Sequence, residues 1–273
     1  MKTKFFASRI LLIAATFVVG CTATTPTPTA PPANPPTTTP PTAQPTSPPE
    51  PILLQYIGHS CTLITAPDGT RIISDPYGDQ PAGLAAFPDD LSADAVTVSH
   101  SHSDHSSAFA VNGKPEVLSK PGSFQVGMVK ITGYQSDHGL VNGEAGGRNT
   151  VFVFEIDEVK LVHLGAAGVV TQNDILAALK NADVVIVDIM GDAAHPITDE
   201  LEQLLERNVR TIIPTHYSFE GHARYYGSAT LAEFLPLVPA ELAITTQSGS
   251  LVPITANMPN QLVILAPAAN DNS

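Results

Sequence analysis

The densest group of potentially catalytic side chains lies in residues 99–105, which read Ser-His-Ser-His-Ser-Asp-His. Imidazole and carboxylate groups are ligands of zinc and similar ions. On an extended segment, alternate residues point to the same side, so His100 and His102 can reach one ion. Asp104 and His105 follow at the turn beyond, where they can reach a second ion nearby. The alternatives are a solvated polar loop that is rich in histidine, or an adventitious metal site.

The metal-binding segment directly follows an apolar run at residues 95–98, which we expect to form a strand. Three further strands are predicted before it, at residues 52–57, 61–65 and 71–74. The breaks between them contain glycine, proline and aspartate, which favour turns. Short strands in quick succession predict an antiparallel beginning of the fold.

The rest of the chain changes from strands to alternating strands and helices. Strands are predicted at 117–119, 124–133, 150–156, 160–164, 184–187, 210–213, 243–245 and 262–265. Helices are predicted after an N-cap at Thr171, after residues 198–200, and at 228–235. This order predicts an α/β (α+β) fold in which two sheets pack face to face with helices outside.

The pattern His-x-His-x-Asp-His at the end of a strand resembles the signature of the metallo-β-lactamase superfamily. Members are mostly zinc-dependent hydrolases with a four-layer αββα sandwich, which is therefore the expected fold. Further segments resemble one branch, the ascorbate-6-phosphate-lactonase-like hydrolases. They lie, in the family's order, at residues 57–60, 74–76, 147–152, 161–165 and 213–217.

The resemblance implies two metal sites and assigns roles to the residues around them. Ligands of one ion would be His100, His102 and His138; ligands of the other would be Asp104, His105 and His216. Asp104 would also orient the attacking water, and His59 or Tyr217 would donate to the developing oxyanion. Asp75 would support the ligands through hydrogen bonds, although a structural role is equally open for Asp75 and His59. Bound zinc lowers the pKa of water from about 15.7 to about 7, which explains hydrolysis at neutral pH.

The chain departs from the family at residues 164–169. The branch usually reads Leu-Gly-Asp-Leu-Gly-His there, whereas this chain reads Leu-Gly-Ala-Ala-Gly-Val. Ala166 stands where a carboxylate normally bridges the two metals, and a methyl group cannot bind a metal ion. We therefore expect one tight zinc site and a weaker second one. A degenerate binding domain without turnover, indicated by Ala166 and Val169, is the alternative.

The remaining histidines and the second cysteine are weaker candidates. His163 lies in the middle of a predicted strand and is expected to be a hydrogen-bonded core residue. His195 and His222 are at best accessory to the site. Cys61 lies in an apolar strand, where a buried thiol that fills the core is expected.

The first 51 residues predict export and membrane attachment. Residues 1–20 combine Lys and Arg at the start with an apolar run at 10–19, as secretory signals do. Residues 18–21 resemble a bacterial lipobox, with Val18 in the usual place of leucine, so Cys21 would carry lipid. The alternatives are a plain signal with an incidental cysteine, which gives a secreted or periplasmic protein, or an uncleaved anchor.

The segment from residue 21 to 51 is a predicted disordered tether. It consists almost entirely of Thr, Pro, Ala and Ser and contains 12 prolines, so it cannot bury a core. We expect a lipoprotein on the outer face of a bacterial membrane, with a folded domain at 52–267 and a tail at 268–273.

The charge of the exported part limits its partners. All 26 acidic residues lie from Glu50 onward, against 10 of the 13 Lys and Arg, so its formal charge is −16. Nucleic acids are bound through clustered Lys and Arg, and no such cluster occurs. We therefore expect a small ester, lactone or related acyl or phosphoryl substrate, and no nucleic acid; the oligomeric state stays open.

Overall fold

The computed structural model describes residues 50–78, 82–141, 144–145, 147–189, 197–225 and 228–268. All of these residues belong to the unit Thr46–Ser273. The predicted signal, Cys21, most of the tether, His195 and most of the tail lie outside the described residues. No helix among the described residues is long and apolar enough to cross a membrane.

The first sheet has the strand order β15-β1-β2-β3-β4-β5. Its strands are β1 (Ile52–Gly58), β2 (Cys61–Thr65), β3 (Arg71–Ser74), β4 (Ala95–Thr97), β5 (Glu116–Leu118) and β15 (Leu251–Ile254). The predicted antiparallel beginning is confirmed for β1, β2 and β3, whereas β3, β4 and β5 are parallel. Strand β15 is absent from the sequence-based prediction because it contains Pro253, which a strand tolerates at the edge of a sheet.

The second sheet has the order β14-β16-β13-β12-β11-β10-β7-β6. Its strands are β6 (Gly122–Val126), β7 (Val129–Asp137), β10 (Arg148–Ile156), β11 (Val159–His163), β12 (Val184–Asp188), β13 (Thr211–Thr215), β14 (Ala243–Thr246) and β16 (Gln261–Ile264). The short strands β8 (Leu140–Val141) and β9 (Glu144–Ala145) pair separately. The single predicted strand 124–133 is wrong, because β6 and β7 form a hairpin that turns at Gly127. Gly127 has φ +51°, and a Cβ there would lie 1.8 Å from Thr70 Oγ1.

Three α-helices occur among the described residues: α1 (Asn173–Leu179), α2 (Ile197–Glu206) and α3 (Leu231–Phe234). Short 3-10 helices lie at Ala108–Ala110 and Leu235–Leu237. The predicted helix starts need correction: the N-cap of α1 is Gln172 rather than Thr171, and Thr198 lies inside α2. Helix α3 begins later than predicted, after Thr230, which forms a capping box with Glu233.

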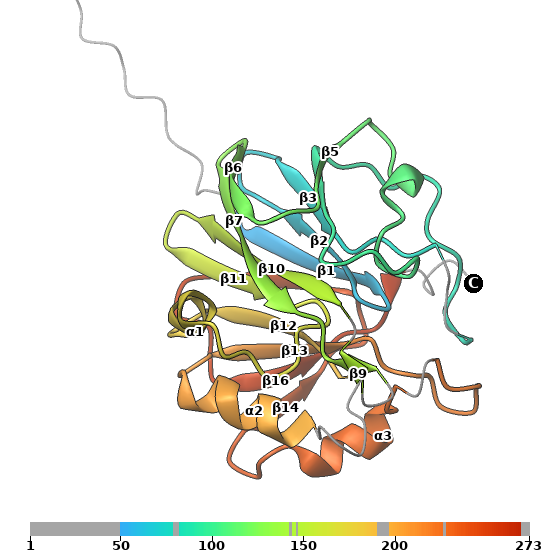
Figure 1. The fold of residues 1–273 in the computed structure, drawn as a ribbon, viewed down its shortest axis with the longest axis vertical. Helices are drawn as coiled ribbons and strands as arrows, with labels where there is room; N and C mark the ends of the chain where they lie inside the picture. The colour runs from blue at the N-terminus through green and yellow to red at the C-terminus, as the bar shows by residue number, and fades with distance from the viewer. Residues whose placement is uncertain are drawn as a thin grey trace, which may run out of the picture. The chain divides into compact units, whose positions relative to one another are not determined.

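The two sheets enclose one large apolar core and confirm the predicted mixed α/β sandwich. The buried faces of α1, α2 and α3 belong to that core, and Figure 1 shows α2 and α3 beside the strands of the second sheet. All five residues of β12 are buried, as its continuous apolar run predicts. A second cluster beside the first sheet contains Cys61, which is fully buried as expected.

The strands that lead to the site share their direction within each sheet. In the first sheet β1, β3 and β4 run the same way, and in the second β7, β11, β12 and β13 do so. Backbone hydrogen bonds join the sheets there: His216 N donates to His59 O at 2.8 Å, and Thr150 N to Ser99 O at 2.8 Å. The carboxyl ends of these strands therefore meet at one edge of the sandwich.

Candidate metal centre

The loops at this edge bring eight potential metal ligands into three overlapping groups, each with its ligand atoms within 4.8 Å of one another; the third, Asp75, His100 and His105, shares one histidine with each of the other two. The first group is His100, His102 and His138; the second is His59, Asp104, His105 and His216. All six residues predicted as ligands belong to these groups, and they divide between them as the sequence comparison implied. His59 is the additional member of the second.

The first group consists of three imidazoles at the surface end of the site. His100 Nε2 lies 3.0 Å from His102 Nδ1, and the ring of His138 lies 4.5 Å from that of His100. His138 Nδ1 donates to Gly139 O at 2.8 Å, which leaves Nε2 for a ligand. His100 and His138 are buried but His102 is exposed, so this group can exchange a ligand with solvent.

The second group surrounds one carboxylate oxygen. Asp104 Oδ2 lies 3.0 Å from His59 Nε2, 3.5 Å from His216 Nε2 and 3.6 Å from His105 Nε2. All four side chains are buried. His216 Nδ1 lies 3.2 Å from the hydroxyl of Ser228, which itself donates to Tyr225 O, so His216 Nδ1 donates to Ser228. Nε2 of His216 faces Asp104, 3.5 Å from its Oδ2.

Asp75 is hydrogen-bonded to His105 of the second group and, through the Ser99 hydroxyl, is linked to His100 of the first. Its Oδ2 accepts from His105 Nδ1 at 2.9 Å, and its Oδ1 accepts from Ser99 N at 2.7 Å. The Ser99 hydroxyl donates to Asp75 and accepts from His100 Nδ1 at 2.9 Å. Such partners set the tautomer of a metal-binding histidine and hold its ring in place. The rings of His100 and His105 lie 4.1 Å apart, so the two groups adjoin.

Burial and neighbouring charges prepare the imidazoles for metal binding. Burial, with the charge of His216, lowers the pKa of His59 to about 4, and burial lowers that of His100 to about 2. Burial also lowers the pKa of His105 and of His138. A metal binds the neutral imidazole, so these shifts leave the ligands in the required state at neutral pH.

The pKa values of Asp104 and His216 are shifted by the contact between these two side chains. Burial alone would raise the pKa of the Asp104 carboxyl, but hydrogen bonds from His216 and His59 outweigh it and hold the pKa well below its usual range. Burial would lower the pKa of His216, but Asp104 and the charge of Asp188 raise it overall. Asp104 is therefore ionised, and it is the charge around which the second group is organised.

The donor set fits zinc or a similar ion. Neutral imidazoles with one carboxylate are typical zinc ligands. Two buried atoms in this region, His59 Nδ1 and Asp188 Oδ2, have no hydrogen-bond partner among the described residues. Buried polar atoms are rarely left without a partner unless a water or an ion completes them.

Three left-handed residues turn the chain sharply at the site. His59, Asp75 and His216 have φ angles of 55°, 47° and 59°, and each directly follows the last residue of a strand. This conformation is unusual for residues other than glycine. It allows each strand to end and its next side chain to turn toward the metal groups.

Tyr217 does not occupy the predicted catalytic position. Its side chain is buried in the core, where the hydroxyl donates to Leu265 O at 3.4 Å and the ring lies 6.1 Å from that of Tyr56. The hydroxyl already has a partner in the core, so Tyr217 is corrected to a core residue.

Among the described residues, His163 and His222 lie outside both groups. His163 is buried; Nε2 donates to Ser60 O at 3.2 Å, and Nδ1 accepts from Gly165 N at 3.2 Å. This confirms the predicted hydrogen-bonded core histidine. His222 is exposed and packs near Gly83, away from the ligand atoms.

Ala166 is held beside the first group by its backbone. Its N–H donates to Asn149 Oδ1 at 3.2 Å, and its carbonyl accepts from Gly139 N at 2.6 Å, directly after His138. Position 166 therefore lies next to the metal centre, as the sequence comparison implied, and it provides no carboxylate.

Three residues of this region were missed from the sequence. The ring of Tyr225 lies edge-on to His59 with 5.0 Å between centroids. Asp188 Oδ1 accepts from the hydroxyls of Ser60, at 2.6 Å, and Thr215, at 2.7 Å. Asp188 could have been found from the sequence, because it is a polar residue at the end of a continuous apolar strand. The metal-binding segment follows the apolar run 95–98 in the same way. Tyr225 carried no such signal, and Ser60 lay in the family-like segment 57–60 without a role being assigned to it.

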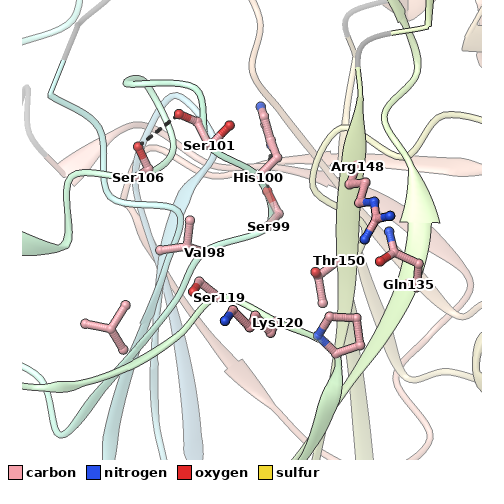
Figure 2. A pocket seen from close by; sticks show the side chains of 12 residues that line it. Val98, Ser99, His100, Ser101, Ser106, Ser119, Lys120, Gln135, Arg148 and Thr150 are labelled. Carbon is pink, nitrogen blue, oxygen red and sulfur yellow. Dashed lines mark hydrogen bonds between the residues drawn. The ribbon is translucent and has the colours of Figure 1, made fainter.

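A pocket of about 780 Å³ opens beside the first group. Its lining includes His100, Lys120, Gln135 and Arg148, and Figure 2 shows Arg148 and Gln135 together on one side and Lys120 toward another. Neither basic side chain is paired with a carboxylate in the part of the chain that the structure describes. The pocket is therefore a positively charged recess in a strongly acidic domain.

Comparison with known proteins places the chain among metal-dependent hydrolases. A sequence profile described as "Beta-lactamase superfamily domain" matches residues 53–216. A "UPF0173 metal-dependent hydrolase" of Carboxydothermus hydrogenoformans is 24% identical over 191 residues, which are 60% of this chain and 84% of that protein. One from Methanopyrus kandleri is 25% identical over 211 residues, which are 74% and 86% of the two chains. A solved structure from Thermotoga maritima, described as a Zn-dependent hydrolase of the metallo-β-lactamase superfamily, aligns with a TM-score of 0.61 and 26% identity, covering 78% of this chain and 98% of that one.

Proposed function

Because this chain belongs to the metallo-β-lactamase superfamily, we propose that it is a zinc-dependent hydrolase of a small ester, lactone or related acyl or phosphoryl substrate. That it is a metal-dependent hydrolase follows from its relatives and from the two ligand groups. The observation that carries the proposal is the carboxylate of Asp104, which lies within 3.6 Å of three imidazole nitrogens in a buried site.

The chemistry divides between the ion and the side chains. When bound, zinc lowers the pKa of water to about 7 and polarises a carbonyl or phosphoryl oxygen. Asp104 stays ionised, so it can accept a hydrogen bond from the attacking water and hold it in place. His59 donates to Asp104 and fixes that carboxylate. Asp75 holds His105 directly and His100 through Ser99, which keeps both rings in their binding orientation.

The pocket favours a substrate with an anionic group. Lys120 and Arg148 are two of the ten Lys and Arg in an otherwise acidic domain, and both line the pocket next to His100. A guanidinium group can bind a carboxylate or phosphate through two parallel hydrogen bonds. The scissile bond would then lie toward His100, with the anionic end of the substrate at Arg148.

A substrate screen tests this function. Purified protein is assayed against lactones, thioesters, β-lactams and phosphodiesters while zinc is titrated. We expect zinc-dependent turnover that Asp104→Ala abolishes. Zinc binding without turnover on any class would favour the alternative, a binding protein that has lost catalysis, for which Ala166 is the supporting observation.

We also propose that the protein is exported and tethered to a membrane through Cys21. The support is the sequence of residues 1–51, and the family match begins only at residue 53. Fractionation of cells that express the wild type or Cys21→Ala tests this. The wild type should be in the membrane fraction and the variant soluble or unprocessed; equal release of both contradicts the tether. A charge of −16 argues against nucleic acid as a partner.

A further inference from the structure

His59 lies against the carboxylate of the second ligand group. It directly follows β1, is only 1% exposed, and its Nε2 lies 3.0 Å from Asp104 Oδ2. Its ring lies 3.8 Å from the ring of His216, and its carbonyl accepts from His216 N at 2.8 Å. The family resemblance gave His59 the role of a hydrogen-bond donor, but its place in this group also allows the role of a metal ligand.

The four side chains of the second group are spaced like the ligands of one ion. Ligand atoms that lie about 2.1 Å from a tetrahedral zinc ion are about 3.4 Å from one another. The distances from Asp104 Oδ2 to Nε2 of His59, His216 and His105 are 3.0, 3.5 and 3.6 Å. All four ligand atoms lie within 4.8 Å of one another. The three separations are therefore those expected along the edges of one zinc site that includes His59.

The hydrogen bonds of His105 indicate a cation at the centre of this group. His105 Nδ1 lies 2.9 Å from Asp75 Oδ2, and a carboxylate accepts, so Nδ1 carries the proton. In a neutral imidazole Nε2 is then unprotonated, and it faces Asp104 Oδ2 at 3.6 Å. Two lone pairs in a buried site repel each other unless a cation lies between them. No Lys or Arg in the described part of the chain pairs with Asp104, so the cation must come from outside the chain.

Nothing among the described residues fixes the proton of His59 on Nε2. Without an ion, Nε2 donates to Asp104, but Nδ1 is buried and has no hydrogen-bond partner in the described part of the chain. An imidazole held in one tautomer normally has a partner on its second nitrogen. The proton of His59 can therefore move to Nδ1 when an ion takes its place at Nε2. Edge-on contacts with Tyr225, at 5.0 Å, and Tyr77, at 6.4 Å, hold the ring itself in place.

The first group offers one ligand fewer. It consists of three imidazoles, of which that of His102 is exposed, and the pocket of about 780 Å³ opens at His100. Ala166, whose carbonyl accepts from Gly139 N directly after His138, adds no side chain that binds an ion. Three protein ligands with one open position are typical of a catalytic zinc, and four protein ligands are typical of a structural one.

We propose that His59 Nε2 is the fourth protein ligand of the second ion, beside the three predicted ligands of that group, and that this ion has no position open for water. The open position, and with it the attacking water, then belongs to the first ion, next to the pocket. Oδ2 of Asp104 binds the second ion, and its Oδ1 is left to orient the water. His59 thus supplies a ligand where Ala166 supplies none. The assignment rests on the proposed metal site and divides the work between its two ions.

The zinc affinity of His59→Gln tests the assignment. Glutamine keeps an amide that can donate to Asp104, but an amide is a poor zinc ligand, so a donor and a ligand give different results. Calorimetric titration should show the first zinc bound as in the wild type and the second bound more than about 100-fold more weakly. Loss of a residue that only supports a ligand costs about 10- to 100-fold, so a loss within that range, or none, would overturn the assignment.

His163→Gln is the matched control. His163 is also 1% exposed, and its Nε2 donates to Ser60 O, directly after His59, but it belongs to neither group. The variant replaces a buried imidazole in the same region, so it should lower the melting temperature and leave both zinc affinities unchanged. An equal loss of the second zinc in both variants would mean that damage to the fold, rather than a lost ligand, is being measured, and would count against His59.

A measurement that leaves His59 in place covers the case in which its variants fold poorly. The variant His100→Ala with His102→Ala removes two ligands of the first group, and cobalt in place of zinc reports the coordination of the second site through its visible absorption. Azide should leave the spectrum of this cobalt-loaded variant unchanged, because four protein ligands occupy the ion. Azide should change the spectrum of the wild type loaded with two cobalt ions, through the open position of the first.

The other outcomes of the azide titration contradict the proposal. A double variant that binds no cobalt, or whose spectrum azide changes, would refute the closed second site. A wild-type spectrum that azide leaves unchanged would refute the open position of the first ion. None of these readouts needs a substrate: a wild type that shows the expected metal binding but no turnover refutes the proposed hydrolysis and leaves the assignment of His59 in place.

Discussion

The two ligand groups differ in how they are built. His100 and His102 lie two residues apart in one loop, and only His138 joins them from another strand end. The second group collects His59, His216 and the pair Asp104 and His105 from three segments, and all of it is buried. The first group is thus largely a local property of the chain, open to solvent at His102. The second exists only when the two sheets are in contact, so its metal affinity reports on the fold.

Removing ligands from the first group should have the largest effect on zinc binding and turnover. The double variant His100→Ala with His102→Ala deletes two of three imidazoles, so the tight zinc should be lost and turnover should fall by at least about 10³-fold, since zinc activates the water. Metal analysis and initial rates measure both. His222→Ala, an exposed histidine outside both groups, should leave both unchanged. Unchanged zinc content in the double variant would falsify the site assignment.

Asp104→Asn removes the charge of the second group while keeping the shape of the side chain. The neutral amide cannot replace the charge at the centre of three imidazoles, so the second zinc should be lost, the first retained, and turnover reduced about 10²- to 10³-fold. Asp137→Asn, an exposed residue beside His138, is the control. Loss of both ions together would show that the two groups are not separable.

Ala166→Asp should change the second group in the opposite direction. A carboxylate shared by two cations should tighten the second zinc up to about tenfold. The metal-free protein should lose about 1–3 kcal/mol of unfolding free energy, because the new charge is buried without a partner. Zinc titration and denaturant unfolding with a chelator measure the two effects. Tighter binding of the first zinc instead would contradict the assignment of position 166 to the second metal site.

Arg148→Gln should have the smallest effect and should leave both metals alone. The pocket opens beside the first group, so this variant should raise the KM of anionic substrates about 5- to 20-fold and leave that of neutral esters unchanged. Steady-state kinetics on a matched anionic and neutral pair measure this. Lys130→Gln, a basic residue of β7 outside the pocket, should behave as the wild type. Equal changes for both substrates would remove the anionic-site assignment.

The sheets were largely predictable because burial leaves a clear pattern. Continuous apolar runs at 95–98 and 184–187 predicted buried strands correctly. The alternation of apolar runs and helix-start residues in the second half predicted its helices. The hairpin at Gly127 was missed because strand-forming residues flank the turn on both sides. Strand β15 was missed because Pro253 argues against a strand unless the edge position is known.

The site residues were predictable where they are close together in the sequence or match the motifs of the family. The six ligands follow from the His-x-His-x-Asp-His segment and its resemblance, but Tyr217 was misplaced because adjacent side chains point to opposite faces, and the face opposite His216 is core. Tyr225 reaches the site only through its tertiary contact with His59. An aspartate at the end of a strand, such as Asp188, also suits an ordinary turn, so burial was needed to single it out.

The left-handed backbone at His59, Asp75 and His216 lowers the stability of the metal-free chain, while the side chains at these positions serve metal binding. Each such residue costs on the order of 1–3 kcal/mol, which a glycine at the same position would relieve. Glycine would, however, remove an imidazole or the carboxylate that orients one. Selection for a more stable metal-free chain would therefore favour losing these three side chains first. Their presence in left-handed turns is what we expect of a fold that is completed by its ions.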